Sequence, residues 1–123
     1  MATTDFEDLR VYQLAERLAD EVWGIVGGWS IFARDTVGKQ PVRAADSVGA
    51  NIAEGCDRRS FNDNKRFVKI ARGSLNETKH FLRRAYKRRL LDDEQVARLK
   101  PILQELPRSL NAYLKSIGRG TTD

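Results

Sequence analysis

The chain has 123 residues, of which 41% are hydrophobic and 8% are aromatic, and its formal net charge is +5. This length and apolar content suit one domain spanning residues 1–123, and the low aromatic share favours helices over a sheet sandwich. A single cysteine, Cys56, excludes an internal disulfide bond and a zinc cluster of several cysteines. Because Cys56 lies in an apolar run, we expect a buried and inert thiol. No secretory signal and no apolar run of membrane length are present, so we expect a cytoplasmic protein that does not enter a membrane.

Charge is distributed unevenly along the chain. Residues 1–57 contain 5 Lys and Arg against 10 Asp and Glu, whereas residues 58–100 contain 14 against 5. The acidic part can contact a basic part of another copy, and the basic part can contact nucleic acid. A simpler interpretation, that these charges only solvate helix faces, stays open at this stage.

The first predicted helix begins after a cap at Thr4 or Asp5 and ends near Gly27. Its apolar residues recur every three or four positions, which is typical of the seam of a helical bundle. They are Val11, Ala15, Leu18, Val22, Ile25 and Trp29. We expect loose ends at residues 1–5 and 118–123.

A second helix should follow a connection at residues 29–36 that packs Ile31 and Phe32 onto the bundle. It begins near residues 35–36, and Pro41 should bend or delay it because proline lacks a backbone N–H and its ring crowds the preceding turn. The positions expected to be buried are Val42, Ala45, Val48, Gly49, Ile52, Ala53 and Cys56. Since these side chains are small, we predict an inner helix that packs closely against its neighbours.

Ser60 is placed to cap a third helix, with Asp63 as an acidic variant of the capping box, and the helix should continue to about Arg89. One face of this helix is suited to a bundle core and carries Phe67, Ala71, Ser74, Thr78, Phe81 and Ala85. A second apolar row beside it recurs every seven residues and either widens the core or contacts another subunit. That row is Val68, Leu75 and Leu82.

A fourth helix should begin after a cap at Asp92 or Asp93, with apolar residues at Val96, Leu99, Leu103, Leu106, Leu110, Tyr113 and Ile117. Pro101 and Pro107 lie inside it, where each should remove a hydrogen bond and kink the helix, and a break near Lys100 is an alternative. Four amphipathic helices with short connections predict an all-α fold, namely an antiparallel up-down-up-down four-helix bundle.

The third helix also carries cations opposite its apolar face. With about 100° of rotation per residue, five of them fall within an arc of roughly 80°. This basic stripe consists of Lys65, Lys69, Arg72, Lys79 and Arg83. The helix closes with a C-terminal basic cluster of Arg83, Arg84, Lys87, Arg88 and Arg89, more cations than the helix dipole alone explains.

We therefore predict that the basic stripe and the C-terminal basic cluster bind the phosphates of RNA or DNA, with steep salt dependence. Nothing in the sequence indicates a base-reading helix or an aromatic stacking platform, so strong sequence specificity is not expected.

Glu54 lies among small and apolar residues, where a carboxylate is expected to have a cationic partner. Arg43, Arg58 and Arg72 are the candidates, and we predict a structural ion pair that fixes helix register. A catalytic role for Glu54 would need a second acid or base on the same face, and none is spaced for it.

His80 is the only histidine and has no nearby carboxylate, which makes it a poor metal ligand. We therefore expect no enzymatic activity, no metal and no cofactor.

Several blocks of the sequence resemble a known family. They are residues 6–12 (FEDLRVY), 40 and 43–45, 47–55 (SVGANIAEG), 58–60 and 66–77 (RFVKIARGSLNE). Over roughly residues 6–90 the chain resembles the four-helix-bundle family of 23S rRNA intervening-sequence proteins. The fourth helix resembles that family only in general character, and Pro41, Pro101 and Pro107 depart from its usual pattern.

The resemblance implies an antiparallel four-helix bundle that assembles into a ring-like homopentamer. It extends to the accessory variability protein of diversity-generating retroelements, which has a basic surface, binds nucleic acid and associates with a reverse transcriptase. The chain is thus expected to be an oligomeric, non-enzymatic binder of RNA or DNA, with a reverse transcriptase as an implied partner. The alternative is a protein-interaction module in which the basic face meets the acidic first helix (Glu16, Asp20 and Glu21) of another copy or partner.

Overall fold

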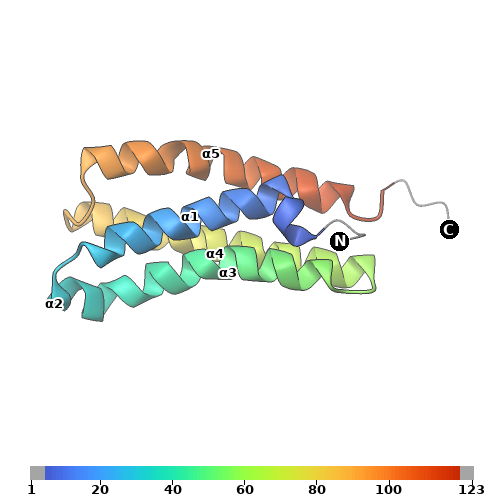
Figure 1. Ribbon diagram of the computed structural model, residues 1–123, viewed down its shortest axis with the longest axis horizontal. Helices are drawn as coiled ribbons and strands as arrows, with labels where there is room; N and C mark the ends of the chain where they lie inside the picture. The colour runs from blue at the N-terminus through green and yellow to red at the C-terminus, as the bar shows by residue number, and fades with distance from the viewer. Residues whose placement is uncertain (1–4, 120–123) are drawn as a thin grey trace.

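Four long helices form an antiparallel bundle in the computed structural model, which describes residues 5–119 (Figure 1). The long helices are α1 (Arg10–Gly27), α3 (Lys39–Cys56), α4 (Phe61–Lys87) and α5 (Asp93–Ser116). The short elements are a 3₁₀ turn at Phe6–Asp8, α2 (Ile31–Ala33) and a π-helix at Arg34–Gly38. Consecutive long helices reverse direction along the molecule, and residues 5–119 contain no strand, so the predicted fold class is confirmed. The expected loose ends fall mostly outside the described residues.

The four long helices occupy the corners of a square. α1 packs against α3 and α5, α4 packs against the same two helices, and α1 and α4 are therefore diagonal to each other. The contact between α3 and α4 is the most extensive. In it, the hydroxyl oxygens of Ser47 of α3 and Ser74 of α4 lie 2.9 Å apart. Within α4, the Thr78 hydroxyl donates a hydrogen bond to the Ser74 carbonyl at 2.8 Å. The contact between α4 and α5 is the least extensive among these neighbours, and a groove remains along it.

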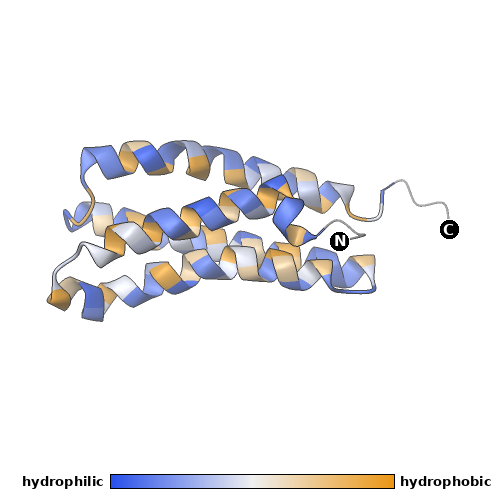
Figure 2. Ribbon diagram, in the orientation of Figure 1, coloured by the Kyte–Doolittle hydropathy of each residue, from blue (hydrophilic) through white to orange (hydrophobic). Residues whose placement is uncertain are grey.

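The core lies where the apolar faces of the four helices meet (Figure 2). Every predicted seam residue of α1 is buried, together with Trp29, whose indole N–H donates to the Leu90 carbonyl at 2.9 Å. The second apolar row of α4 is buried as well, at 1%, 1% and 5% exposure for Val68, Leu75 and Leu82. That row therefore widens the intramolecular core.

Two of the predicted helix caps are confirmed. The Ser60 hydroxyl accepts a hydrogen bond from the Asp63 N–H at 3.0 Å, and the Asp92 carboxylate accepts one from the Gln95 N–H at 2.7 Å. The Gln95 side chain in turn accepts from the Asp92 N–H at 3.0 Å, which completes a capping box.

The predicted start of α1 is wrong in part. A 3₁₀ turn precedes the helix, and α1 begins at Arg10 after Leu9, which has an extended backbone. Asp5 lies before the 3₁₀ turn without a side-chain cap, and Thr4 lies outside the described residues. The turn allows Leu9 to pack against the core before the helix begins.

The second helical segment begins earlier than predicted. α2 starts after Ser30, whose hydroxyl accepts from the Ala33 N–H at 3.2 Å, and the chain stays helical into α3. The π-helix lies just before Pro41, and its wider turn gives space to a ring that an α-helical turn would crowd. The expected packing of Ile31 and Phe32 is also wrong, because these side chains are 69% and 79% exposed.

α5 is continuous through Pro101 and Pro107, so the alternative of a break near Lys100 is wrong. The expectation of a buried Cys56 is wrong too, because its side chain is exposed at the end of α3. Its Sγ lies 3.3 Å from the Tyr113 hydroxyl of α5.

Candidate nucleic-acid interface

The nine predicted nucleic-acid-binding residues all lie on α4 or in the turn directly after it. They are Lys65, Lys69, Arg72, Lys79, Arg83, Arg84, Lys87, Arg88 and Arg89. All are exposed except Lys65, which is partly buried. None of the nine forms an ion pair with a carboxylate of residues 5–119. Their charge is therefore directed to solvent and available to an external anion.

The basic stripe faces outward beside the seam between α4 and α5. There the two helices enclose an open groove of about 440 Å³, and Lys79 and Arg83 line it from α4. Lys100 of α5 lines the same groove from the other helix, so it extends the cationic surface beyond the predicted stripe. The sequence gives no signal for this, because the rotation of α5 about its axis decides which helix Lys100 faces.

The C-terminal basic cluster surrounds the end of α4. The Arg88 N–H donates to the Arg84 carbonyl at 3.0 Å, and the Leu90 N–H donates to the Ala85 carbonyl at 2.9 Å. Arg89 has a positive φ of 62°, a left-handed conformation that ends the helix and redirects the chain. Cations here are stabilised by the negative end of the helix dipole, so the helix can hold them close together.

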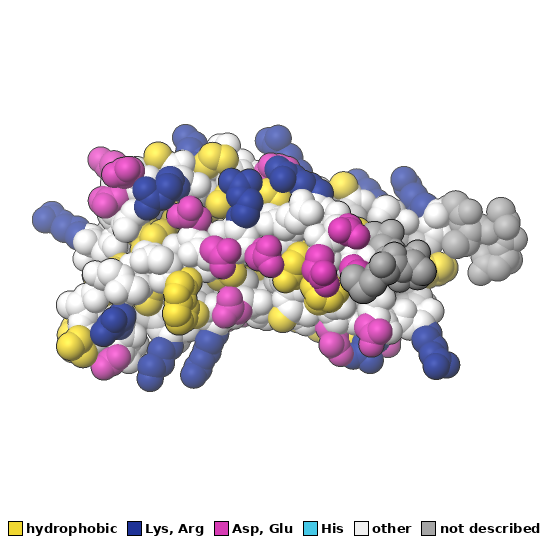
Figure 3. Space-filling model, in the orientation of Figure 1, with side chains coloured by type: hydrophobic (Ala, Val, Ile, Leu, Met, Phe, Trp, Pro, Cys, Tyr) yellow, Lys and Arg dark blue, Asp and Glu magenta, His cyan; other side chains and the backbone are white. Residues whose placement is uncertain are grey.

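The opposite corner of the bundle is acidic. Figure 3 shows the face crossed by α1, where Asp and Glu gather along the middle and Lys and Arg project mostly at the edges. Glu21 pairs with Arg98 of α5 at 3.3 Å, whereas Glu16 and Asp20 are exposed and pair with no cation of residues 5–119. Because α1 and α4 are diagonal, the acidic and basic faces point away from each other.

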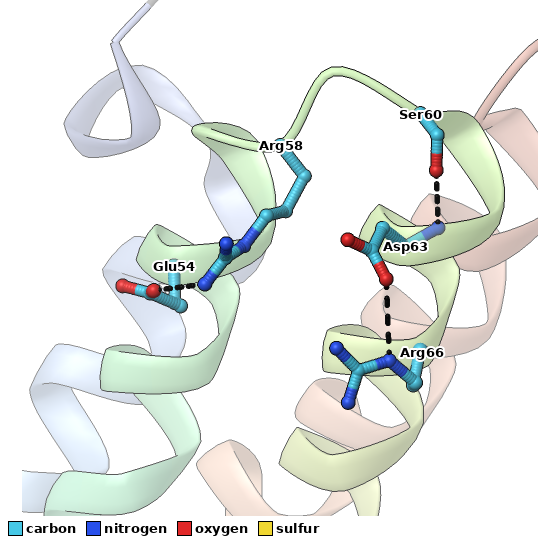
Figure 4. Close-up of polar contacts among 5 residues, drawn as sticks. All are labelled: Glu54, Arg58, Ser60, Asp63 and Arg66. Atoms are coloured by element: carbon cyan, nitrogen blue, oxygen red, sulfur yellow. Dashed lines mark hydrogen bonds and ion pairs between the residues drawn. The ribbon is translucent and has the colours of Figure 1, made fainter.

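The predicted ion pair of Glu54 is formed with Arg58, one turn away, at the corner between α3 and α4 (Figure 4). Both side chains are solvent-accessible, at 53% and 37% exposure, so the pair does not lie inside the bundle as expected. The Arg58 guanidinium also lies 4.7 Å from the centroid of the Phe67 ring, which links this corner to α4. Within residues 5–119, Arg43 and Arg72 form no ion pair, and both are exposed.

His80 is exposed beside the basic stripe, with its ring edge-on to Phe81 at 5.2 Å between centroids. No group of three His, Cys, Asp or Glu residues within residues 5–119 is arranged to hold a metal ion. No helix in that part of the chain is both long and apolar enough to span a membrane.

Two tyrosines away from the stripe have shifted pKa values. Burial raises the pKa of Tyr113 to about 12, with a further contribution from its hydrogen bond to Cys56 and an opposing one from Asn64. Burial also raises the pKa of Tyr12, and the neighbouring Glu16 carboxylate, which accepts its hydroxyl hydrogen bond at 3.3 Å, adds to this. Neither group belongs to the cationic surface.

Residues 7–112 match the family described as 23S rRNA-intervening sequence protein. The chain belongs to this family. The match spans α1 to α4 and most of α5, so it includes the helix that carries the basic stripe. It does not distinguish the accessory variability branch, which stays a prediction. A search of curated proteins finds no match to this member of the 23S rRNA-intervening sequence protein family.

Proposed function

We propose that this member of the 23S rRNA-intervening sequence protein family is a non-enzymatic protein that binds RNA or DNA along α4. The observation that supports this function is the gathering of nine cations on α4 and in the turn directly after it, none with a carboxylate partner among residues 5–119. Four arginines pair with the protein's own acids, as Arg98 does with Glu21, but none of these nine does so within residues 5–119. The α4 cations are left for an external polyanion.

The length of the stripe suits a nucleic-acid backbone. From Lys65 to Arg83 it runs for about 27 Å along the helix axis, at about 1.5 Å per residue. Duplex DNA presents one phosphate about every 1.7 Å of its axis when both strands are counted, so several phosphates face the stripe at once. If five are neutralised, affinity should fall by roughly 500-fold between about 50 and 200 mM salt.

Assembly into an oligomer would bring several copies of the basic stripe together. By resemblance to its family, the protein is proposed to form a homo-oligomer, specifically a pentamer, in which each copy repeats the basic stripe. Repetition increases avidity without adding any contact. A reverse transcriptase is the partner proposed by resemblance to the accessory variability branch, with this protein presenting the nucleic acid to it.

The test is charge reversal on α4. Changing Lys69, Lys79 and Arg83 to Glu should reduce affinity for RNA and DNA by at least about 100-fold at moderate salt, because it removes three phosphate contacts and adds repulsion. Fluorescence anisotropy with labelled oligonucleotides measures the affinity, and circular dichroism checks helicity. The matched control reverses the same number of exposed charges away from α4, at Arg17, Arg34 and Lys39. Equal losses in the two variants would show that net charge, and not α4, governs binding.

A second candidate function is supported by the acidic corner of the bundle. Trp23 of α1 is 70% exposed and lies one turn from Asp20. Exposed tryptophans are frequent anchors of protein interfaces. The protein would then be an interaction module whose acidic α1 face contacts the basic face of another copy or a partner.

A further inference from the structure

The groove between α4 and α5 has an apolar floor and a cationic rim. Leu82 of α4 and Leu99 of α5 contribute to the floor, whereas Lys79, Arg83 and Lys100 stand around it. No acidic side chain lines the groove. Its volume of about 440 Å³ falls in the range of ligand-binding clefts. The apolar floor has no role in binding phosphates, so the phosphate-binding function leaves it unexplained.

Tyr86 adds an aromatic surface to this groove. It lies on α4 one turn beyond Arg83 and two turns beyond Lys79, so the three side chains project along the same side of the helix. Tyr86 is 49% exposed, and within residues 5–119 its hydroxyl makes no hydrogen bond to another residue. A half-exposed ring between cations is the arrangement used by proteins that stack nucleobases. The structure therefore places an exposed aromatic ring among these cations, which the sequence analysis did not single out.

We propose that the α4/α5 groove holds an unpaired base of single-stranded nucleic acid, stacked on Tyr86, while Lys79, Arg83 and Lys100 bind the flanking phosphates. This inference rests on the proposed nucleic-acid binding and specifies its substrate as single strands or unpaired segments. The bases of a duplex are stacked on each other and cannot enter the groove without being unstacked. The phosphates of a duplex can still reach the stripe, so duplexes bind by charge alone.

The experiment compares single strands with duplexes. Anisotropy titrations use a labelled 12-nucleotide RNA, its DNA equivalent, the matching duplexes, and a DNA strand of the same length whose sugars carry no bases. The wild-type protein should bind single strands about tenfold more tightly than the abasic strand. Tyr86→Ala should lose that tenfold preference, which corresponds to about 1.4 kcal/mol, and should bind duplexes and the abasic strand as the wild type does. The RNA and DNA arms show which sugar is preferred.

Two control variants separate stacking from other effects. Tyr86→Phe keeps the ring and should keep the preference for single strands. Trp23→Ala removes an aromatic side chain on the diagonal helix that is even more exposed than Tyr86, at 70% against 49%, and should change no affinity. If Tyr86→Ala binds single strands as tightly as the wild type, the groove does not hold a base. The same conclusion follows if this substitution changes only the oligomeric state of the protein, as measured by sedimentation, and leaves its affinities unchanged. Phosphate binding by α4 would still stand in that case, because the charge-reversal variant tests it separately.

Discussion

At the scale of single residues, the cations of the bundle differ in whether they form an ion pair and in where they gather. Four arginines pair with carboxylates, and each pair stabilises a helix end or a contact between helices; they are Arg10, Arg58, Arg66 and Arg98. The nine predicted binding residues form no such pair within residues 5–119, although Asp63 and Glu77 lie on the same helix. Exposed cations that form no ion pair within residues 5–119 also lie elsewhere, for example Arg17, Arg34 and Lys39, so the gathering of nine of them on α4 and the turn after it is what identifies this helix as the candidate interface.

Tyr113 provides a residue-scale test of the packing between α3, α4 and α5. Its folded-state pKa of about 12 lies above the ordinary value of 10.0, so the fold favours the neutral phenol. This contribution to stability is fully present below about pH 10 and is lost as the pH rises through about 12. Tyrosinate absorbance during a pH titration should therefore show a late phase that Tyr113→Phe removes. A folded protein whose tyrosines all titrate near pH 10 would contradict the partly buried position of this phenol.

At the scale of helices and turns, local hydrogen bonds determine where each helix begins or ends, and packing against other helices stabilises its middle. α5 begins with a reciprocal capping box between Asp92 and Gln95, and α4 begins with the Ser60 cap. The π-helix that ends at Gly38 widens the chain just before Pro41, where an α-turn would be crowded. A Cβ added to Gly38 would lie 2.8 Å from Val26 Cγ1, so this turn needs a glycine to approach α1.

The cap of α5 gives a prediction at this scale. Asp92→Ala should lower the free energy of unfolding by about 1 kcal/mol, because it leaves the Gln95 N–H without its acceptor. The matched control is Asp93→Ala, which removes a neighbouring carboxylate that favours the helix dipole but accepts no capping bond, and which should cost only a few tenths of a kcal/mol. Urea denaturation measures both. Equal effects would show that charge at the helix start matters more than the hydrogen bond.

At the scale of the whole molecule, the two charged faces lie at diagonal corners. The acids of α1 are separated from the cations of α4 by the width of the bundle, so they cannot neutralise each other within one copy. Between two copies, the acids of one can neutralise the cations of the other. Such a head-to-tail contact is electrostatically favourable at low salt. In the second candidate function, where the protein is an interaction module, nucleic acid and a second copy would compete for the same cations.

This competition predicts a salt-dependent assembly. Changing Glu16 and Asp20 to Lys should reduce self-association at low salt, as measured by sedimentation velocity, because it removes the acidic half of the contact. Changing Asp35 and Asp57 to Lys makes the same charge change elsewhere and should have less effect. Added RNA should shift the wild type away from the assembly that Glu16 and Asp20 support. If neither the salt concentration nor added RNA changed the assembly, this would contradict a contact made through the acidic and basic faces.

Much of the fold could be predicted because it depends on short-range patterns. The three- and four-residue spacing of apolar side chains identified all four long helices, and Ser60 and Asp92 marked two of their starts. Helix boundaries were less well predicted, since α1 begins later and the second helical segment earlier than expected. The wrong expectations about burial concern residues whose environment depends on distant parts of the chain. Phe32 is apolar yet exposed, and Cys56 lies in a small-residue stretch yet faces outward at the end of α3.

The sequence by itself determined four amphipathic helices and a line of cations along the third of them, because helical periodicity fixes which residues share a face. Only the tertiary structure decided what lies beside that line. Lys100 and Tyr86 line the same groove from opposite helices because α4 and α5 pack loosely and Lys100 lies on the side of α5 that borders α4. Relative rotation of packed helices is set by all their contacts together, and no local pattern encodes it.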